Sequence, residues 1–227
     1  MRAQCTYILS GAAVLAVFLC HAALAASVAD KLQERYTRIE TMRADFTQVL
    51  VHKESGSREQ RAGVLSFKKP LLVRWETKTP APELLLVGAD AIWNAFPDEE
   101  LVYKYSLSMA EDSRSIVRVV TGQARLDQDF DLEEEGRDGA LLTVRLYPRE
   151  PAQFMVEALL WIDPGTWLIK KLRVYDFYGN ENEITFARQE VDAAVADSLF
   201  RYSPPKAFIV EDRTKDAGAA PRKALMQ

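Results

Sequence analysis

The feature that most constrains the fold is a long series of short apolar segments, each bounded by turn residues. In the stretch FKKPLLVRWET, residues 67–77, the apolar residues Leu71, Val73 and Trp75 alternate with neighbours that are mostly polar. This period of two is typical of a half-buried β-strand. Because such segments follow one another with no helical pattern between them, the sequence predicts antiparallel hairpin connections, and therefore a β-barrel or a β-sandwich.

Two runs of strands are predicted, one on each side of a helical interruption. The first run comprises residues 44–51, 63–67, 71–77, 83–87, 91–96 and 100–105. The second comprises residues 130–135, 141–147, 154–163, 166–178 and 182–190, and a last short strand is expected at 208–210. Pro164-Gly165 and Gly179-Asn180 are strong hairpin turns between long partners. We therefore expect one mainly antiparallel sheet of about ten or eleven strands, a size at which such sheets tend to curl.

Two segments carry the helical period instead. From Val28 to Arg43, apolar residues recur every three or four positions, which predicts an amphipathic N-terminal helix. In the middle of the chain, Ser108 followed by Glu111 has the form of a capping box, and Gly122 is a typical helix stop. Ile116, Val117 and Val120 share one side of this helix. Because it interrupts the strands, the mid-chain helix is predicted to be a lid over the interior of the curled sheet.

The first 25 residues predict an export signal. Arg2 is followed by an apolar run that ends at Cys20, and Ala23-Leu24-Ala25 has the small-residue pattern of a cleavage site. The large Leu19 before Cys20 disfavours acylation of that cysteine. We expect residues 1–25 to be removed on export to the periplasm, residues 26–212 to form one domain, and residues 213–227 to form a flexible tail. Cys5 and Cys20 would leave with the signal, so no thiol or disulfide chemistry is expected.

Catalytic, metal-binding and nucleic-acid-binding chemistry finds little support in the sequence. The formal net charge is −4, whereas nucleic-acid binding needs a clustered basic surface. His52 is the one histidine after the signal segment, and it lies in a polar stretch. No phosphate loop, dinucleotide fingerprint, EF-hand or nucleophile elbow is present. The acidic run Glu133-Glu134-Glu135 leads into a turn and is interpreted as solvated charge. We therefore expect no enzyme activity, no cofactor and no metal.

Three separated segments resemble the periplasmic outer-membrane lipoprotein carrier (LolA-like) family. Met42 to Gln48 is similar to the family's aromatic-x-Ala-x-Phe-x-Gln segment, and Phe67 to Trp75 resembles its Lys-Arg-Pro…Phe-x-Trp segment. Leu199 to Pro205, with Val210 to Asp212, resembles its Phe-x-Phe-x-Pro-Pro ending. The resemblance implies an incomplete, strongly curved antiparallel β-barrel, closed by helices around an apolar cavity. It also implies a monomeric carrier that takes acylated lipoproteins from an inner-membrane ABC lipoprotein-releasing complex and hands them to an outer-membrane lipoprotein receptor.

The resemblance also implies a set of lipid-binding residues. The expected lining of the cavity is Leu71, Val73, Trp75, Leu84, Leu86, Trp93, Leu101, Tyr103, Ile116, Val117, Val120 and Trp161. Lys69 stands where the family usually has an arginine that helps to control the lid and cargo transfer; lysine keeps the charge but loses the planar five-donor fork. From the residues alone, each of the strand aromatics is first interpreted as ordinary core, and the set also fits a cavity lining. A lipid- or lipoprotein-binding sensor, or a carrier of another envelope lipid, is the alternative function.

Overall fold

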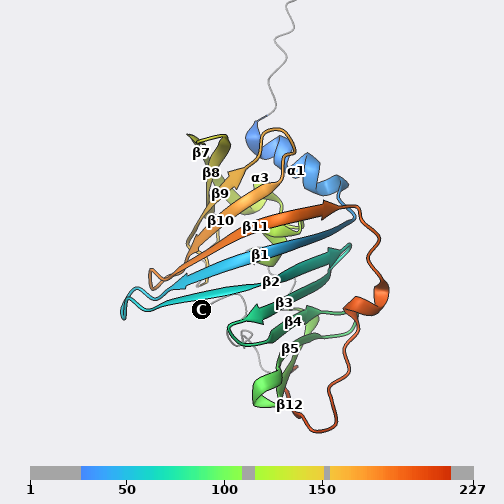
Figure 1. The fold of residues 1–227 in the computed structure, drawn as a ribbon. Helices are drawn as coiled ribbons and strands as arrows, with labels where there is room; N and C mark the ends of the chain where they lie inside the picture. The colour runs from blue at the N-terminus through green and yellow to red at the C-terminus, as the bar shows by residue number, and fades with distance from the viewer. Residues whose placement is uncertain (1–26, 109–115, 151–153, 216–227) are drawn as a thin grey trace, which may run out of the picture.

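The computed structural model describes residues 27–108, 116–150 and 154–215, which form mainly β-structure (Figure 1). The helices are α1 (Val28–Arg38), α2 (Ile116–Val120) and α3 (Leu126–Asp129), with 3-10 turns η1 (Pro97–Glu99) and η3 (Asp197–Phe200). The strands are β1 (Thr41–Val51), β2 (Arg58–Lys68), β3 (Leu72–Thr79), β4 (Glu83–Val87), β5 (Ile92–Phe96), β6 (Leu101–Tyr105), β7 (Phe130–Asp138), β8 (Leu141–Pro148), β9 (Glu157–Ile162), β10 (Ile169–Tyr175), β11 (Glu181–Val191) and β12 (Ile209–Asp212). Within these ranges, none of the helices has the length and hydropathy needed to span a membrane.

All twelve strands form one sheet in the order β12-β6-β5-β4-β3-β2-β1-β11-β10-β9-β8-β7. β1 joins the two runs of strands, because it pairs with β2 on one side and with β11 on the other. Neighbouring strands are antiparallel except for β12, which pairs with β6 in parallel. In the described part of the chain the edge strands β7 and β12 are not paired with each other, so the sheet is open. The expected incomplete, antiparallel barrel is confirmed. The last short strand expected at 208–210 is β12, and only its parallel pairing with β6 was not predicted.

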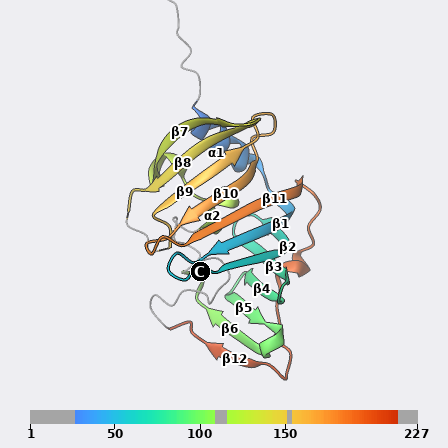
Figure 2. The same ribbon diagram turned by 60° about the vertical axis from the view of Figure 1, so that its left-hand side comes forward.

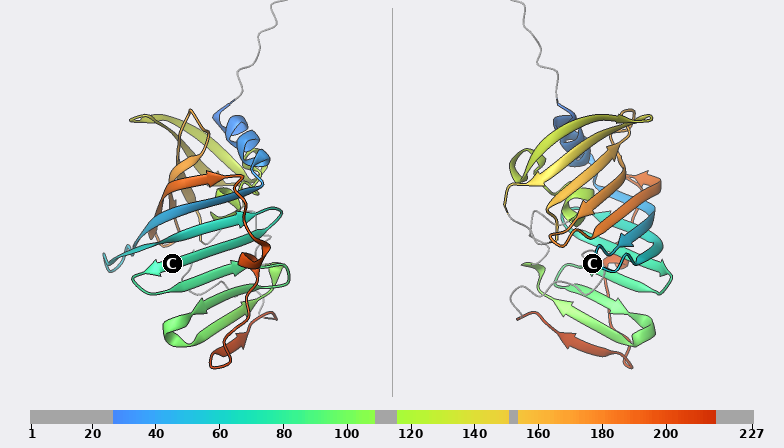
Figure 3. Two further views of the ribbon diagram at one scale, coloured as in Figure 1. Left: turned by 45° about the vertical axis from the view of Figure 1, so that its right-hand side comes forward. Right: turned by 90° about the vertical axis from the view of Figure 1, so that its left-hand side faces the viewer.

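The sheet curves around the three helices, which lie on its concave side (Figures 2 and 3). Leu32 and Tyr36 of α1, Val117 and Val120 of α2, and Leu126 of α3 are buried in one cluster with the strand residues that face them. α1 begins with a capping box, in which Ser27 Oγ accepts from Asp30 N and the Asp30 carboxylate accepts from Ser27 N. The main hydrophobic core therefore lies between the concave face of the sheet and the helices.

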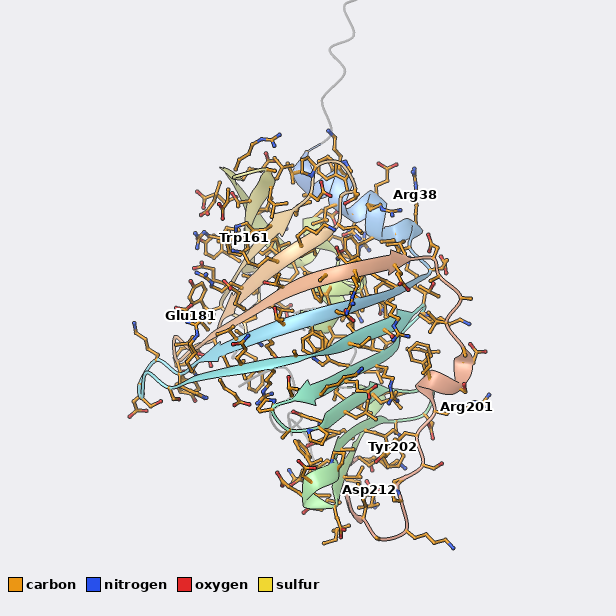
Figure 4. All side chains as sticks on the ribbon, in the orientation of Figure 1. Arg38, Trp161, Glu181, Arg201, Tyr202 and Asp212 are labelled. Atoms are coloured by element: carbon orange, nitrogen blue, oxygen red, sulfur yellow. The ribbon has the colours of Figure 1, made fainter. Side chains whose placement is uncertain are left out.

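The chain after β11 covers part of the convex face. Tyr202 and Phe208 pack against a second buried cluster formed by Leu84, Leu86, Ala95 and Val102. The rings of Trp93 and Tyr202 have their centroids 5.7 Å apart. Lys68 Nζ forms an ion pair with Asp197 at 2.6 Å, which ties the start of this covering segment to β2. Figure 4 labels Tyr202 in this segment and Asp212 at the end of β12.

The predicted N-terminal helix is too long by five residues at its C-terminal end. α1 ends at Arg38, and Ile39 already has extended backbone with φ −75° and ψ 119°. Thr41 pairs with Lys68 of β2, and Met42 pairs with both Phe67 and Val191. Backbone hydrogen bonds on two sides therefore replace a helical continuation that the spacing of Ile39 and Met42 also allowed.

The mid-chain helix is described only in part. α2 covers Ile116–Val120, and Gly122, with φ +72°, ends it as predicted. Glu111 of the expected capping box lies outside the described residues, as do the predicted signal segment and residues 216–227 of the predicted tail. The short helix α3 was not predicted.

Candidate functional site

The concave face of the sheet is the candidate site, and strand register assembles it. Trp75 pairs with Leu65 on one side and with Leu85 on the other, so these three side chains share a face. Phe46 of β1 contacts the same patch, with its ring centroid 4.7 Å from that of Trp75. The same face continues through Asn94 of β5, which pairs with Leu85, to Tyr103 of β6. Ile92 and Phe96 flank Asn94 on this face. A continuous buried apolar surface thus extends over strands from both halves of the sheet.

The helices cover this surface through a close contact at the end of α2. A Cβ placed on Gly122 would lie 2.4 Å from Tyr36 Cβ, so glycine allows α2 to approach α1. Leu126 N of α3 donates to Gln33 Oε1 of α1 at 3.0 Å. The three helices therefore pack on one another as well as on the sheet.

Tyr36 fastens α1 to the far half of the sheet. Its hydroxyl oxygen accepts a hydrogen bond from Ile169 N of β10 at 3.1 Å. Burial raises the pKa of the Tyr36 hydroxyl far above its ordinary value, because the ionised form would be desolvated. The hydroxyl therefore stays neutral and acts as a structural hydrogen-bond partner.

Lys69 lies in the β2–β3 turn and holds the C-terminal end of α1. Its Nζ donates to the carbonyl oxygen of Tyr36 at 3.1 Å and also to that of Thr37. A cation at a helix C-terminus satisfies open carbonyl groups and complements the helix dipole. Lys69 is thus placed at the junction between a helix that covers the concave face and the edge of that face.

The structure separates the predicted lining residues into two groups. Val73, Trp75, Tyr103, Val117 and Val120 are buried in the concave cluster, and Leu71 and Leu101 pack against it. Ile116 begins α2, and its side chain lies outside the described part of the structure.

The other four predicted lining residues, Leu84, Leu86, Trp93 and Trp161, face the convex side. Leu86 pairs with Arg74 and Trp93, which places all three side chains opposite Trp75. Trp161 (labelled in Figure 4) lies between Leu160 and Ile162, both of which belong to the concave cluster. Its ring instead lies 3.7 Å from Lys171 Nζ, and its Nε1 donates to Asp138 at 2.8 Å. The prediction that these four residues line the cavity is therefore wrong. They lie on the convex face, because successive strand residues point to opposite faces.

Several concave residues were missing from the predicted set. They are Phe46, Leu65, Phe67, Leu85, Val87, Ile92 and Phe96. Alternation along residues 44–50 and 63–67 could have indicated the first three. The others required the pairing register, because β4 and β5 are apolar at nearly every position.

One end of the concave face is polar although it is buried. Arg61 forms ion pairs with Glu59 at 2.7 Å and with Glu83 at 3.5 Å. Glu83 also accepts from Asn94 Nδ2 at 3.0 Å, and Gln48 Nε2 donates to Asn182. Among the described residues, the side-chain oxygens of Gln48 and Asn94 are buried without a hydrogen-bond donor. This end of the face can accept hydrogen bonds from a bound polar group.

Most of the chain is similar to known proteins. The family model of the outer membrane lipoprotein carrier protein LolA matches residues 37–203. The chain is similar to the outer-membrane lipoprotein carrier protein of Chromobacterium violaceum, with 26% identity over 86% of this chain and 92% of the relative. It is also similar to that of Vibrio cholerae, with 27% identity over 88% of this chain and 97% of the relative. An uncharacterised conserved protein from Thermus thermophilus has a similar fold, with a TM-score of 0.54 and 14% identity over 82% of this chain and 97% of that chain.

Proposed function

Because the chain belongs to the LolA family of outer membrane lipoprotein carrier proteins, we propose that it carries acylated lipoproteins across the periplasm. In this proposal it acts as a monomeric binding protein and not as an enzyme. It receives its cargo from an inner-membrane ABC lipoprotein-releasing complex and delivers the cargo to a receptor at the outer membrane. The observation that carries the proposal is the apolar concave face, covered by helices rather than by a second sheet.

Covering helices solve the problem of release. Burial of one methylene group contributes ~0.8 kcal/mol, so three long acyl chains entering an empty apolar cavity would gain tens of kcal/mol. A carrier that bound this tightly could not deliver its cargo. Here Val117, Val120 and Leu126 already occupy the concave face. Acyl chains must displace these side chains. The net binding free energy is therefore the difference between the contacts of the acyl chains with the concave face and the contacts of the helices that they replace.

The proposed lipid-facing residues are the concave members of the predicted set. They are Leu71, Val73, Trp75, Leu101, Tyr103, Val117 and Val120, joined by Phe46, Leu65, Phe67 and Leu85. Lys69 is proposed to control the opening of the helices, because its contacts to α1 must change when the helix end moves. The buried polar end around Gln48 and Asn94 would accept hydrogen bonds from the amide groups of the acylated cysteine.

A site-specific cross-linking experiment tests which face holds the cargo. A photoreactive phenylalanine analogue is placed at Tyr103 on the concave face, or at Trp93 on the convex face as a matched aromatic position. Each protein is irradiated in cells and purified from the periplasm. We expect a covalent adduct with an acylated lipoprotein at Tyr103 and none at Trp93. Equal labelling at the two positions, or cargo that copurifies without any adduct at Tyr103, would contradict the proposed site.

A further inference from the structure

Two aromatic side chains are exposed side by side in the turn between β10 and β11. Phe177 is 72% exposed and Tyr178 is 65% exposed, and their rings meet edge to face with centroids 5.6 Å apart. Burial of an aromatic side chain is strongly favourable in a folded protein, so two such neighbours in solvent indicate a partner. We name this pair the aromatic tip.

The backbone beneath the aromatic tip is held in one shape. Asp176 Oδ1 accepts from Tyr178 N and from Asn180 N, each at 2.8 Å. Asn180 Nδ2 donates to Asp176 Oδ2 at 2.7 Å, and Gly179 N donates to Asp176 O at 3.0 Å. Gly179 has φ +77°, a conformation that favours glycine. The Asp176 carboxylate is thus engaged within the turn, and the turn presents the two rings without needing to be ordered on binding.

A second hairpin supports the aromatic tip. Lys53 N, in the β1–β2 turn, donates to Asn180 Oδ1 at 3.0 Å. The aliphatic part of Lys53 lies over Gly179, with Cγ 3.5 Å from where a Cβ would stand. Figures 1 and 2 show these two turns extending together at the end of the sheet away from α1. Lys53 therefore belongs to the same protruding end of the sheet as the two rings.

Further exposed apolar residues lie at the same end of the sheet. Val156 precedes β9, is exposed, and its N donates to Tyr175 O at the end of β10. Tyr147, near the end of β8, is also exposed. Strand direction explains the grouping: β8 and β10 end where β9 and β11 begin.

We propose that the aromatic tip inserts into the interfacial region of a lipid bilayer. Two aromatic side chains cover about 300–500 Å² at most, whereas a stable protein interface buries roughly 800 Å² per partner. A bilayer needs no complementary pocket, and it accepts a small protruding wedge. Tyrosine and phenylalanine suit its interface, and Lys53 would lie at the level of the lipid phosphates.

The location of the aromatic tip connects it to the proposed carrier function, on which this part of the inference rests. Leu172 and Val174 of β10 and Ile184 of β11 belong to the concave cluster. The strands that carry the tip are therefore also part of the proposed lipid-binding wall. Insertion would hold the rim of that wall against the membrane while acyl chains leave or enter.

Flotation with lipid vesicles tests the inference. The exported form, without the predicted signal, is mixed with extruded vesicles of phosphatidylethanolamine and phosphatidylglycerol that contain no protein. We expect the wild-type protein to float with the vesicles, and we expect Phe177→Ser/Tyr178→Ser to lower its partition coefficient at least about tenfold. The matched control Ile209→Ser/Val210→Ser removes two exposed apolar side chains from β12 and should leave the partition coefficient unchanged.

A second measurement locates the contact. Because both cysteines lie in the predicted signal, Phe177→Cys or Ile209→Cys gives the exported form a single site for an environment-sensitive fluorophore. Vesicles should shift the emission to the blue at position 177 only. The proposal is overturned if the wild-type protein does not float, or if the tip variant floats equally well. It is also overturned if the emission at position 177 shifts only when a membrane protein is added. Uptake of an acyl-chain probe in vesicle-free solution is measured in parallel, so that loss of the carrier function is distinguished from loss of membrane contact.

Discussion

Gly122 allows a sharp test of how the helices cover the concave face. In Gly122→Ala the new Cβ would lie 2.4 Å from Tyr36 Cβ and 3.0 Å from its Cδ1, whereas carbon atoms pack best at about 3.5–4.0 Å. Overpacking of this kind costs about 1–3 kcal/mol. The φ of +72° adds about 1–2 kcal/mol for a residue with a Cβ. The free energy of unfolding should therefore fall by roughly 2–5 kcal/mol.

The substitution should also change cargo binding. The smallest movement that relieves the contact shifts the end of α2 away from Tyr36. Because α2 contributes Val117 and Val120 to the concave cluster, its displacement would uncover apolar strand residues. We expect Gly122→Ala to bind a fluorescent acyl-chain probe more tightly than the wild type does, although the protein is less stable. Urea unfolding measures the stability, and titration with the probe measures the affinity.

Gly139→Ala is the matched control. Gly139 also has a positive φ, +59°, but no atom lies within 4 Å of the added Cβ. Its free energy of unfolding should therefore fall only by the cost of the backbone conformation, about 1–2 kcal/mol. Its affinity for the probe should be unchanged. If Gly122→Ala were no less stable than Gly139→Ala, the packing argument would be refuted. A large loss of stability with unchanged probe affinity would refute the inference that α2 covers the binding face.

Three further predictions concern single side chains. Trp75→Ala should lower the free energy of unfolding by about 3–5 kcal/mol, measured by urea denaturation, because it empties a fully buried position. Tyr36→Phe leaves Ile169 N without its acceptor, which should cost about 1–3 kcal/mol. The raised pKa of Tyr36 contributes stability that is present below the unfolded value of about 10 and is lost as pH rises above it, so this variant should flatten the alkaline limb of a stability–pH curve. The ion pair with Lys68 lowers the pKa of Asp197. Its contribution to stability is therefore present above the unfolded pKa of about 3.9 and is lost as pH falls below that value. Asp197→Asn should remove this acid-dependent loss, measured as the pH dependence of proteolysis after η3.

Local sequence predicted the ends of a strand well where an apolar run is bounded by turn residues on both sides. β4 was predicted with both ends correct, at Glu83 and Val87. β2 was predicted to begin at Gly63 but begins at Arg58, because its polar first half pairs with β1 as far as Val51. Hairpin register extends a strand beyond its apolar run, and no local pattern reports that extension.

The sequence by itself determined the alternation of side chains, the succession of strands along the chain and the positions of the principal turns, because each depends on residues close together in the chain. It also carried the family motifs. Only the tertiary structure decided which of two apolar faces became the concave one. Trp93 and Tyr202, more than one hundred residues apart in the sequence, meet on the convex side, where the covering segment buries Leu84 and Leu86. Period-two alternation separates two faces but does not say what covers each of them, and that assignment comes from long-range packing.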